Sequence, residues 1–222
     1  MQDLIKLEQF ELEVLDKLNS SKLLTRFVFG GGTMLRLCFG LSRFSVDLDF
    51  WVVENLNFKK LFRDLKECLT ESYALKDHAN KFHTLLFEIK SGIYPRSLKI
   101  EVRKEVKKIT PDTAIAYSKH SNTQVLLRVV SLQDMMDAKI EAFLTRKEIR
   151  DVFDLEFLLK KGTGLNAPAQ KLKKLLIGID ALTKRDYRVK LCSLLEKEQR
   201  PYYIENNFKV LKLAIKEKIN IK

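Results

Sequence analysis

Apolar residues recur at helical spacing along LIKLEQFELEVLDKL and again along FKKLFRDLKECLTESY. This period predicts two amphipathic helices, the first of which ends near Asn19 and Ser20. Shorter apolar or alternating runs predict strands at 26–29, 47–53 and 125–130 and in HTLLFEI and SLKIEVR. We therefore expect an α/β (α+β) first domain with a small mixed sheet.

The pattern changes after residue 130. Ser131 with Asp134 three residues later resembles a capping box, which starts a helix. The following segments all have a helical period, broken at GTGLNAP and near Arg200 and Pro201. We predict a strand-containing domain over 1–130 and a helical C-terminal domain over 131–222.

Two carboxylates follow a glycine cluster in FVFGGGTMLRLCFGLSRFSVDLDF, residues 27–50. Successive side chains of a strand point to opposite faces, so Asp47 and Asp49 point the same way, about 6–7 Å apart. Mg²⁺ typically binds one or two carboxylates and completes its shell with water and phosphate oxygens. The pair predicts a magnesium site.

The glycines upstream suit a phosphate. Gly31 and Gly32 have no Cβ, so the backbone can turn sharply and approach a phosphate, and Thr33 adds a hydroxyl. A glycine cluster alone is usually only a turn, and Asp-Leu-Asp alone is a common half-exposed strand. Their combination at this spacing favours a nucleotide site.

GGTMLRL followed by RFSVDLDF resembles the AbiEii family of toxin nucleotidyltransferases, which includes the MenT toxins, within the DNA polymerase beta type superfamily. The resemblance implies a polymerase beta type nucleotidyltransferase domain and Mg²⁺-dependent transfer of a nucleoside monophosphate from an NTP. Ser45 matches the serine of the family's RxSxDxD pattern. Arg43 at the same end reaches a phosphate or is simply solvated.

A second block, KIEAFLTRKEIRDVFDLEFLL over 139–159, resembles the family's lysine, arginine and RDxxDL block. One continuous helix would align Lys139, Arg146, Arg150 and Asp154 along one face. Lys139 and the arginines would then bind NTP phosphates, and Asp154 would orient Lys139 or Arg150. The alternative is an exposed helix with weak ion pairs.

A third carboxylate is expected on a neighbouring strand, and Glu101 is the candidate. Leu98, Ile100 and Val102 alternate with polar residues, so Glu101 lies on the polar face of its strand. It either points into the site as general base for the incoming hydroxyl or points to water in an ion pair.

The net charge of +12 concerns the acceptor. Residues 1–110 hold 19 Lys and Arg against 15 Asp and Glu, and the remainder holds 22 against 14. A basic surface attracts polyanions, although lysines can also serve only solubility. With a nucleotidyltransferase site, a structured RNA is the favoured acceptor.

Several classes of protein are disfavoured. No apolar run is long enough to span a bilayer, and charges interrupt the N-terminal segment, unlike a signal peptide. The three cysteines form no CxxC pair, which suits a reducing cytoplasm, and the three histidines lack zinc-site spacing.

By resemblance, the expected function is that of a toxin of a toxin–antitoxin system that blocks translation by modifying the 3′ end of tRNA, with a cognate antitoxin as partner. Transfer onto a protein hydroxyl, including self-modification, remains open. So does a non-catalytic RNA-binding module. The sequence does not select the NTP or the oligomeric state.

Overall fold

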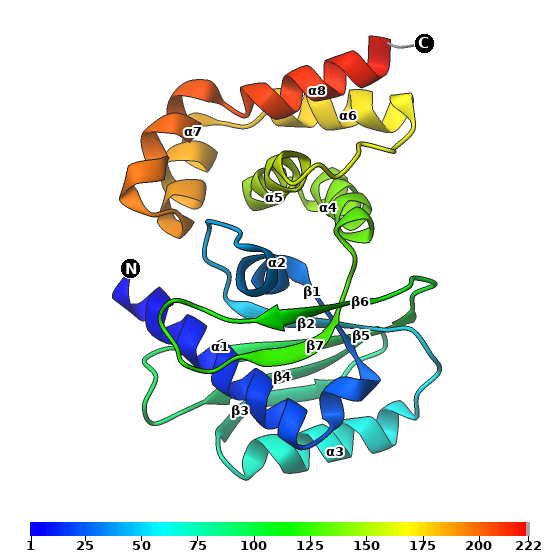
Figure 1. Cartoon of the computed structure of the whole chain (residues 1–222), viewed down its shortest axis with the longest axis vertical. Coiled ribbons are helices and arrows are strands. Elements are labelled where there is room, and N and C mark those ends of the chain that lie inside the picture. Colours follow the sequence, from blue (N-terminus) through cyan, green and yellow to red (C-terminus); the bar gives the residue numbers. More distant parts are fainter. Residues whose placement is uncertain (221–222) are drawn as a thin grey trace. The chain divides into compact units, whose positions relative to one another are not determined.

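The computed structural model describes residues 1–220 and divides the chain into two compact units. Unit 1 is Met1–Ser131, and unit 2 begins at Leu132. Each unit is described on its own. Figure 1 labels the helices and strands of both units.

Unit 1 contains a seven-stranded mixed sheet with the strand order β3-β4-β5-β2-β1-β7-β6. The pairs β2–β5 and β1–β7 are parallel, and the other neighbouring pairs are antiparallel. The mixed sheet with helices confirms the predicted fold class. In chain order the elements are α1 (Gln2–Ser20), a 3₁₀ turn (Leu23–Arg26), β1 (Val28–Gly30), α2 (Gly31–Phe39), β2 (Asp47–Val52), α3 (Phe58–Thr70), β3 (Ala74–Asn80), β4 (Thr84–Lys90), β5 (Leu98–Val106), β6 (Asp112–Ala116) and β7 (Val125–Val129).

The two edge strands, β3 and β6, were not predicted from the sequence. Most of their side chains are exposed, so neither strand shows the apolar alternation that marks a half-buried strand. The strand predicted at 26–29 is also shifted, because Arg26 closes a 3₁₀ turn and β1 begins at Val28. The pattern of apolar residues therefore does not predict exposed edge strands or the exact ends of strands.

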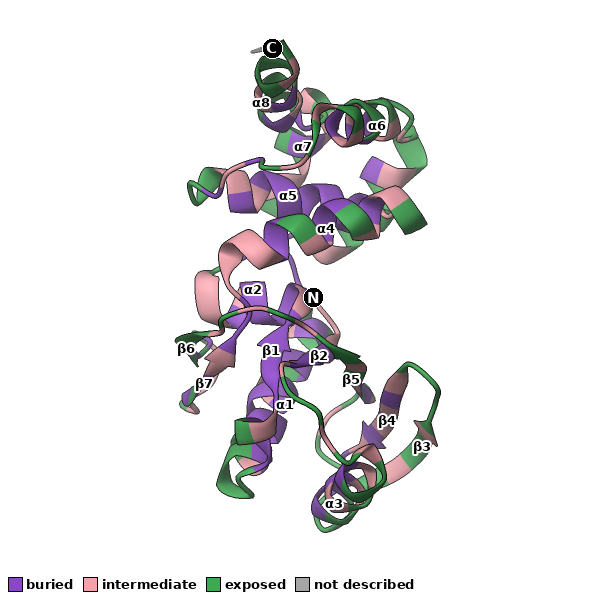
Figure 2. Cartoon of the chain, turned by 90° about the vertical axis from the view of Figure 1, so that its right-hand side faces the viewer, coloured by how far each residue is buried: buried purple, intermediate pink, exposed green. Residues whose placement is uncertain are grey.

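The strands β2, β4 and β5 have one buried and one accessible face. Phe87 of β4 and Ile100 of β5 are register partners and fully buried. Helix α3 packs on this buried face, where the ring of Phe62 lies 4.9 Å from that of Phe87. Along β4, buried and intermediate positions alternate, which can be followed in Figure 2. The opposite face of the same strands is left accessible.

Carboxylates on α1 fasten distant segments of unit 1. Glu13 accepts hydrogen bonds from the phenols of Tyr73 (2.9 Å) and Tyr94 (2.8 Å). Burial, followed by the bond to Glu13, raises the pKa of Tyr94 to about 12, so this phenol stays a donor at neutral pH. The segment before β3 and the loop before β5 are thus both held to α1.

One turn away, Glu8 accepts hydrogen bonds from Arg36 of α2 and from the hydroxyl of Ser118. Glu11 is fully buried, and neither of its carboxylate oxygens has a hydrogen-bond partner in the described chain. Burial, with Glu8 nearby, raises the pKa of Glu11 well above its ordinary value.

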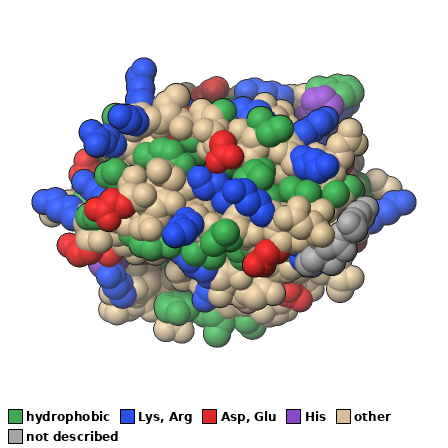
Figure 3. Space-filling view, turned by 90° about the horizontal axis from the view of Figure 1, so that it is seen from above, with side chains coloured by type: hydrophobic (Ala, Val, Ile, Leu, Met, Phe, Trp, Pro, Cys, Tyr) green, Lys and Arg blue, Asp and Glu red, His purple; other side chains and the backbone are tan. Residues whose placement is uncertain are grey.

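Unit 2 is helical. Its elements are α4 (Leu132–Arg146), α5 (Ile149–Lys160), α6 (Ala169–Asp180), a π turn (Asp186–Leu191), two 3₁₀ turns (Cys192–Leu194 and Lys197–Gln199), α7 (Arg200–Asn206) and α8 (Lys209–Asn220). Viewed from above, the surface carries more Lys and Arg than Asp and Glu side chains (Figure 3). Of the helices in residues 1–220, none combines the length and hydropathy that a bilayer-spanning segment needs.

The single helix predicted over 139–159 is wrong, because the chain bends between α4 and α5. Lys147 has a φ of 55°, and its amide donates 2.9 Å to the carbonyl of Phe143, which closes α4. Glu148 is extended and precedes α5. Left-handed residues end helices, and this position is usually glycine, so a lysine here gives no signal in the sequence.

Candidate active site

The glycine cluster lies directly against the carboxylate of Asp49. Gly31 has a φ of 76°, and a Cβ placed on it would lie 2.4 Å from Asp49 Oδ2. Only glycine combines that backbone angle with that proximity. Strand β1 ends at Gly30 and α2 begins at Gly31, so the free N–H groups of the first turn of α2 open beside Asp49.

Gly32 packs against two other residues predicted for the site. A Cβ there would lie 2.6 Å from Arg43 Nη2 and 2.8 Å from Ser45 Oγ. Arg43 is only 2% exposed, and its Nη1 donates 2.9 Å to the carbonyl of Phe44. Burial excludes the alternative in which Arg43 is simply solvated.

Thr33 has a different environment from the one expected. Its side chain is fully buried, and its hydroxyl donates 2.6 Å to the backbone carbonyl of Asp47. A hydroxyl has one proton to donate, so in this structure Thr33 ties α2 to β2 rather than facing a phosphate. This hydrogen bond holds the start of α2, and with it the glycine turn, against the strand that carries the two aspartates.

Asp47, Asp49 and Glu101 lie on the same face of the sheet. Strands β2 and β5 are parallel, and Asp49 is the register partner of Glu101. Both aspartates and Glu101 are partly accessible. The sequence left open whether Glu101 points into the site or to water in an ion pair. The register places it on the same face as the two aspartates.

The position of Glu101 beside the two aspartates affects its pKa. Burial raises the pKa of Glu101, and the charges of Asp49 and then Asp47 raise it further. Arg103 and Lys99 act in the opposite sense. A carboxylate with a raised pKa is a stronger base, which suits removal of a proton from a hydroxyl.

The oxygens of this face fit a hard divalent cation. Among residues 1–220, no group of three His, Cys, Asp or Glu side chains is placed to hold a metal ion. Two carboxylates beside a glycine turn are still the donor set that Mg²⁺ takes when phosphate oxygens and water complete its shell. The carboxylate of Asp49 fills the space that a Cβ on Gly31 would need, so the turn lies directly against one of the two carboxylates.

In unit 2, the predicted phosphate-binding lysine is held by two aspartates. Lys139 Nζ lies 2.7 Å from Asp154 Oδ2 and 3.5 Å from Asp151 Oδ1. Both aspartates have fully buried side chains, and that of Lys139 is only 8% exposed. Of the two partners open to Asp154 in the sequence, the structure pairs it with Lys139, across the bend between α4 and α5.

Asp151 was missed from the sequence. Arg146 donates to it twice, from Nε (2.7 Å) and from Nη2 (2.6 Å), which is a bidentate ion pair. Asp151 is the first aspartate of the RDxxDL block, so the motif contained the signal. In the single helix that we predicted, however, Asp151 would lie on a different face from Lys139 and Arg146. Arg150 is half-exposed on α5.

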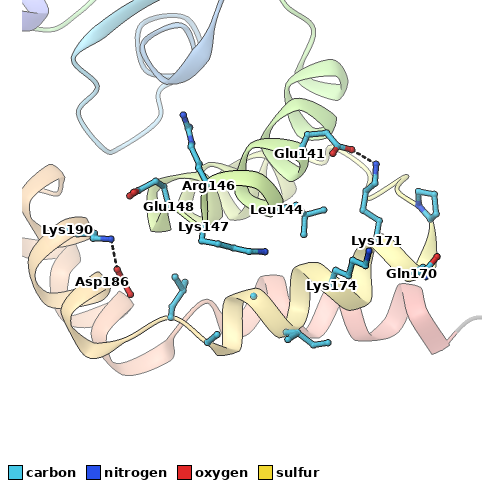
Figure 4. A pocket seen from close by; sticks show the side chains of 15 residues that line it. Glu141, Leu144, Arg146, Lys147, Glu148, Gln170, Lys171, Lys174, Asp186 and Lys190 are labelled. Carbon is cyan, nitrogen blue, oxygen red and sulfur yellow. Dashed lines mark hydrogen bonds and ion pairs between the residues drawn. The ribbon is translucent and has the colours of Figure 1, made fainter.

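Unit 2 also contains a groove of about 1030 Å³ between α4 and α6, bounded at one end by the π turn. Figure 4 shows lysines at its rim, two of them in ion pairs, Lys171 with Glu141 and Lys190 with Asp186. Lys147 and Lys174 add further positive charge, and Leu144, Ile177 and Leu182 are apolar residues of the lining. The groove is a basic concave surface that sequence reasoning did not find.

The chain thus combines a mixed sheet with a glycine turn packed on one of two aspartates of the same strand. The family model "Nucleotidyl transferase AbiEii toxin, Type IV TA system" matches residues 13–206. The chain belongs to this family, as its motifs predicted. The family is one of nucleotidyltransferase toxins, and it implies an NTP substrate and an antitoxin.

Solved structures share the fold. A putative nucleotidyltransferase from H. pylori is 22% identical, with a TM-score of 0.59 over 94% of this chain and 96% of that one. JHP933 from Helicobacter pylori is 22% identical, with a TM-score of 0.58 over 95% and 94%. The nucleotidyltransferase toxin MenT4 from Mycobacterium tuberculosis H37Rv is 15% identical, with a TM-score of 0.52 over 92% and 85%.

No curated protein matches the chain.

Proposed function

We propose that this protein transfers a nucleoside monophosphate from an NTP to an RNA, specifically to the 3′ end of tRNA, and thereby blocks translation in the cytoplasm. The observation that carries the proposal is the packing of Gly31 on Asp49, because it joins a phosphate-binding turn to a metal-binding carboxylate. The positive charge of the surface supports a polyanionic acceptor.

Asp47 and Asp49 would hold Mg²⁺, which when bound neutralises phosphate charge and lowers the barrier to displacement at phosphorus. The N–H groups at the start of α2, freed by Gly31 and Gly32, bind phosphate oxygens. Arg43, buried behind Gly32, supports the turn and adds positive charge.

Glu101 removes the proton from the acceptor hydroxyl. The hydroxyl oxygen then forms a bond to the α-phosphorus, the bond from that phosphorus to the β-phosphate oxygen breaks, and pyrophosphate leaves. We assign the charge of Lys139, oriented by Asp154, to the leaving pyrophosphate. Asp151 positions both Lys139 and Arg146.

The first test compares Asp49→Asn and Asp47→Asn with the native protein. Each purified protein is incubated with total RNA, Mg²⁺ and each α-labelled NTP in turn. Because asparagine keeps the shape but loses the charge that a metal requires, we expect label on a tRNA-sized band to fall at least about 100-fold. Circular dichroism checks that the variants fold.

The matched control is Asp112→Asn, which removes an exposed charge from the edge strand β6 and should leave labelling unchanged. Native activity in the Asp49→Asn protein would contradict the assigned metal site. Label on a polypeptide instead of RNA would replace the acceptor by a protein hydroxyl. If the native protein blocks translation but transfers label from none of the NTPs, it is a non-catalytic RNA-binding module.

A further inference from the structure

The accessible face of the sheet continues from the aspartates across two more strands. Lys99 of β5 is the register partner of Asp47, as Glu101 is of Asp49. Leu86 of β4 is in turn the partner of Glu101. Partner residues on neighbouring strands point to the same face. The carboxylates therefore lie at one side of a continuous surface formed by β2, β5 and β4.

This surface is available to a partner, and its back is not. On the back, Ile100 and Val102 of β5 and Phe87 of β4 are fully buried, and α3 packs there. On the front, Leu86 is half-buried and Lys99 is exposed. The front has the polar character of a binding surface rather than of a core.

Two cations flank the proposed base. Lys99 and Arg103 lie two residues before and two residues after Glu101, so all three side chains share the face, and both cations are exposed. A strand rises about 3.3 Å per residue, which puts the Cα atoms of Lys99 and Arg103 about 13 Å apart. Both cations also act on the charge of Glu101. A polyanion that ends at Glu101 would therefore have two cations close to its last phosphates.

We propose that the 3′ end of the acceptor RNA lies on this face beside β5, with its terminal hydroxyl at Glu101 and with Lys99 and Arg103 binding the phosphates of its last nucleotides. Leu86, opposite Glu101, gives an apolar surface for the ribose or base. The inference rests on the proposed function and names the residues that would position its acceptor. Phosphate contacts of this kind set register without reading sequence.

The test is the double variant Lys99→Gln/Arg103→Gln. Binding of fluorescent tRNA is measured by anisotropy at several salt concentrations, and transfer is measured over a range of tRNA concentrations. We expect tRNA affinity to fall at least about tenfold and the slope of log K against log[salt] to shrink by about 1.4, because two phosphate contacts are lost. The KM for tRNA should rise while binding of Mg²⁺–NTP is retained.

The matched control is Lys59→Gln/Arg63→Gln. It removes the same charge from exposed positions of α3, the helix on the back of these strands, and should leave affinity and slope near the native values. Native affinity and slope in the Lys99/Arg103 variant, together with native transfer to RNA, would overturn this inference alone. Label on a polypeptide and none on RNA in the native protein would overturn it together with the proposed function.

Discussion

At the scale of single residues, the site depends on what glycine lacks. Gly31 and Gly40 both have a positive φ, 76° and 79°. Around Gly31 the carboxylate of Asp49 fills the space that a Cβ would need, whereas around Gly40 nothing lies within 4 Å of that position. A substitution at Gly40 therefore tests the strain of the backbone angle alone, whereas one at Gly31 also tests the contact with Asp49.

We expect Gly31→Ala to reduce nucleotidyl transfer at least about 100-fold, because the new methyl group would displace Asp49 from the turn. Gly40→Ala should retain transfer and lose only about 1–2 kcal/mol of unfolding free energy, the cost of a left-handed angle. Labelling assays and urea unfolding of both variants measure this. Equal losses of activity in the two variants would show that the contact with Asp49 has no special role.

The residues that the sequence identified by themselves are those in local motifs. Asp47 and Asp49 are two apart on one strand, so their shared face follows from the strand period alone. The partners of Thr33 and Asp151 could not be predicted in the same way. Each depends on how the chain returns, to the carbonyl of Asp47 in one case and across the bend to Lys139 in the other.

At the scale of elements, amphipathic period predicted α1 and α3 well, and the turn at Lys147 defeated it. A left-handed lysine is stabilised by its surroundings, here including a cation–π contact of 5.3 Å between Lys147 Nζ and the ring of Phe143. Such a tertiary contact leaves no trace in a helical pattern. The edge strands β3 and β6 were not predicted for a related reason. They form by pairing with their neighbours, and their own exposed side chains show no strand pattern.

The helical turn that opens at Thr183 offers a pH test. The amide and hydroxyl of Thr183 donate 2.8 and 2.7 Å to Asp186 Oδ2, and Lys190 pairs with the same carboxylate group. Burial works against the charge, but these bonds outweigh it and lower the pKa of Asp186 to about 2. The unfolded value is about 3.9. Asp186 therefore stabilises the fold above that value and loses the contribution as the pH falls towards 2.

We expect Asp186→Asn to lower the free energy of unfolding by about 1 kcal/mol at pH 6, the usual worth of such a cap. The difference from the native protein should shrink as the pH falls from 4 to 2. Urea unfolding at pH 6, 4, 3 and 2 measures it. A difference that stays constant over this range would contradict the role given to the charge of Asp186.

At the scale of the whole molecule, positive charge is shared between the units. Unit 1 has 21 Lys and Arg against 16 Asp and Glu, and unit 2, counted to the end of the sequence, has 20 against 13. The sequence predicted this excess directly, since charge needs no fold to be counted. It did not predict the groove of unit 2 or the front of β5, because both gather residues by register and packing.

A polyanion bound through this charge is released by salt. If about six phosphates are contacted, tRNA affinity should fall about 10³-fold between 50 and 200 mM salt. Anisotropy titrations with the Asp49→Asn protein measure this without turnover. An affinity independent of salt would show that the positive charge takes no part in RNA binding.

The carboxylates of α1 have a consequence for the order in which the chain acquires its structure. Glu8 meets Ser118 across 110 residues, and Glu13 meets Tyr94 across 81. In unit 2, Lys212 meets Asp180 across 32 residues and Lys139 meets Asp151 across 12. Contacts between distant positions form slowly, because a long loop must close before they are made. We therefore expect the helical unit to fold faster than unit 1, which is completed only when α1 has found partners up to 110 residues away.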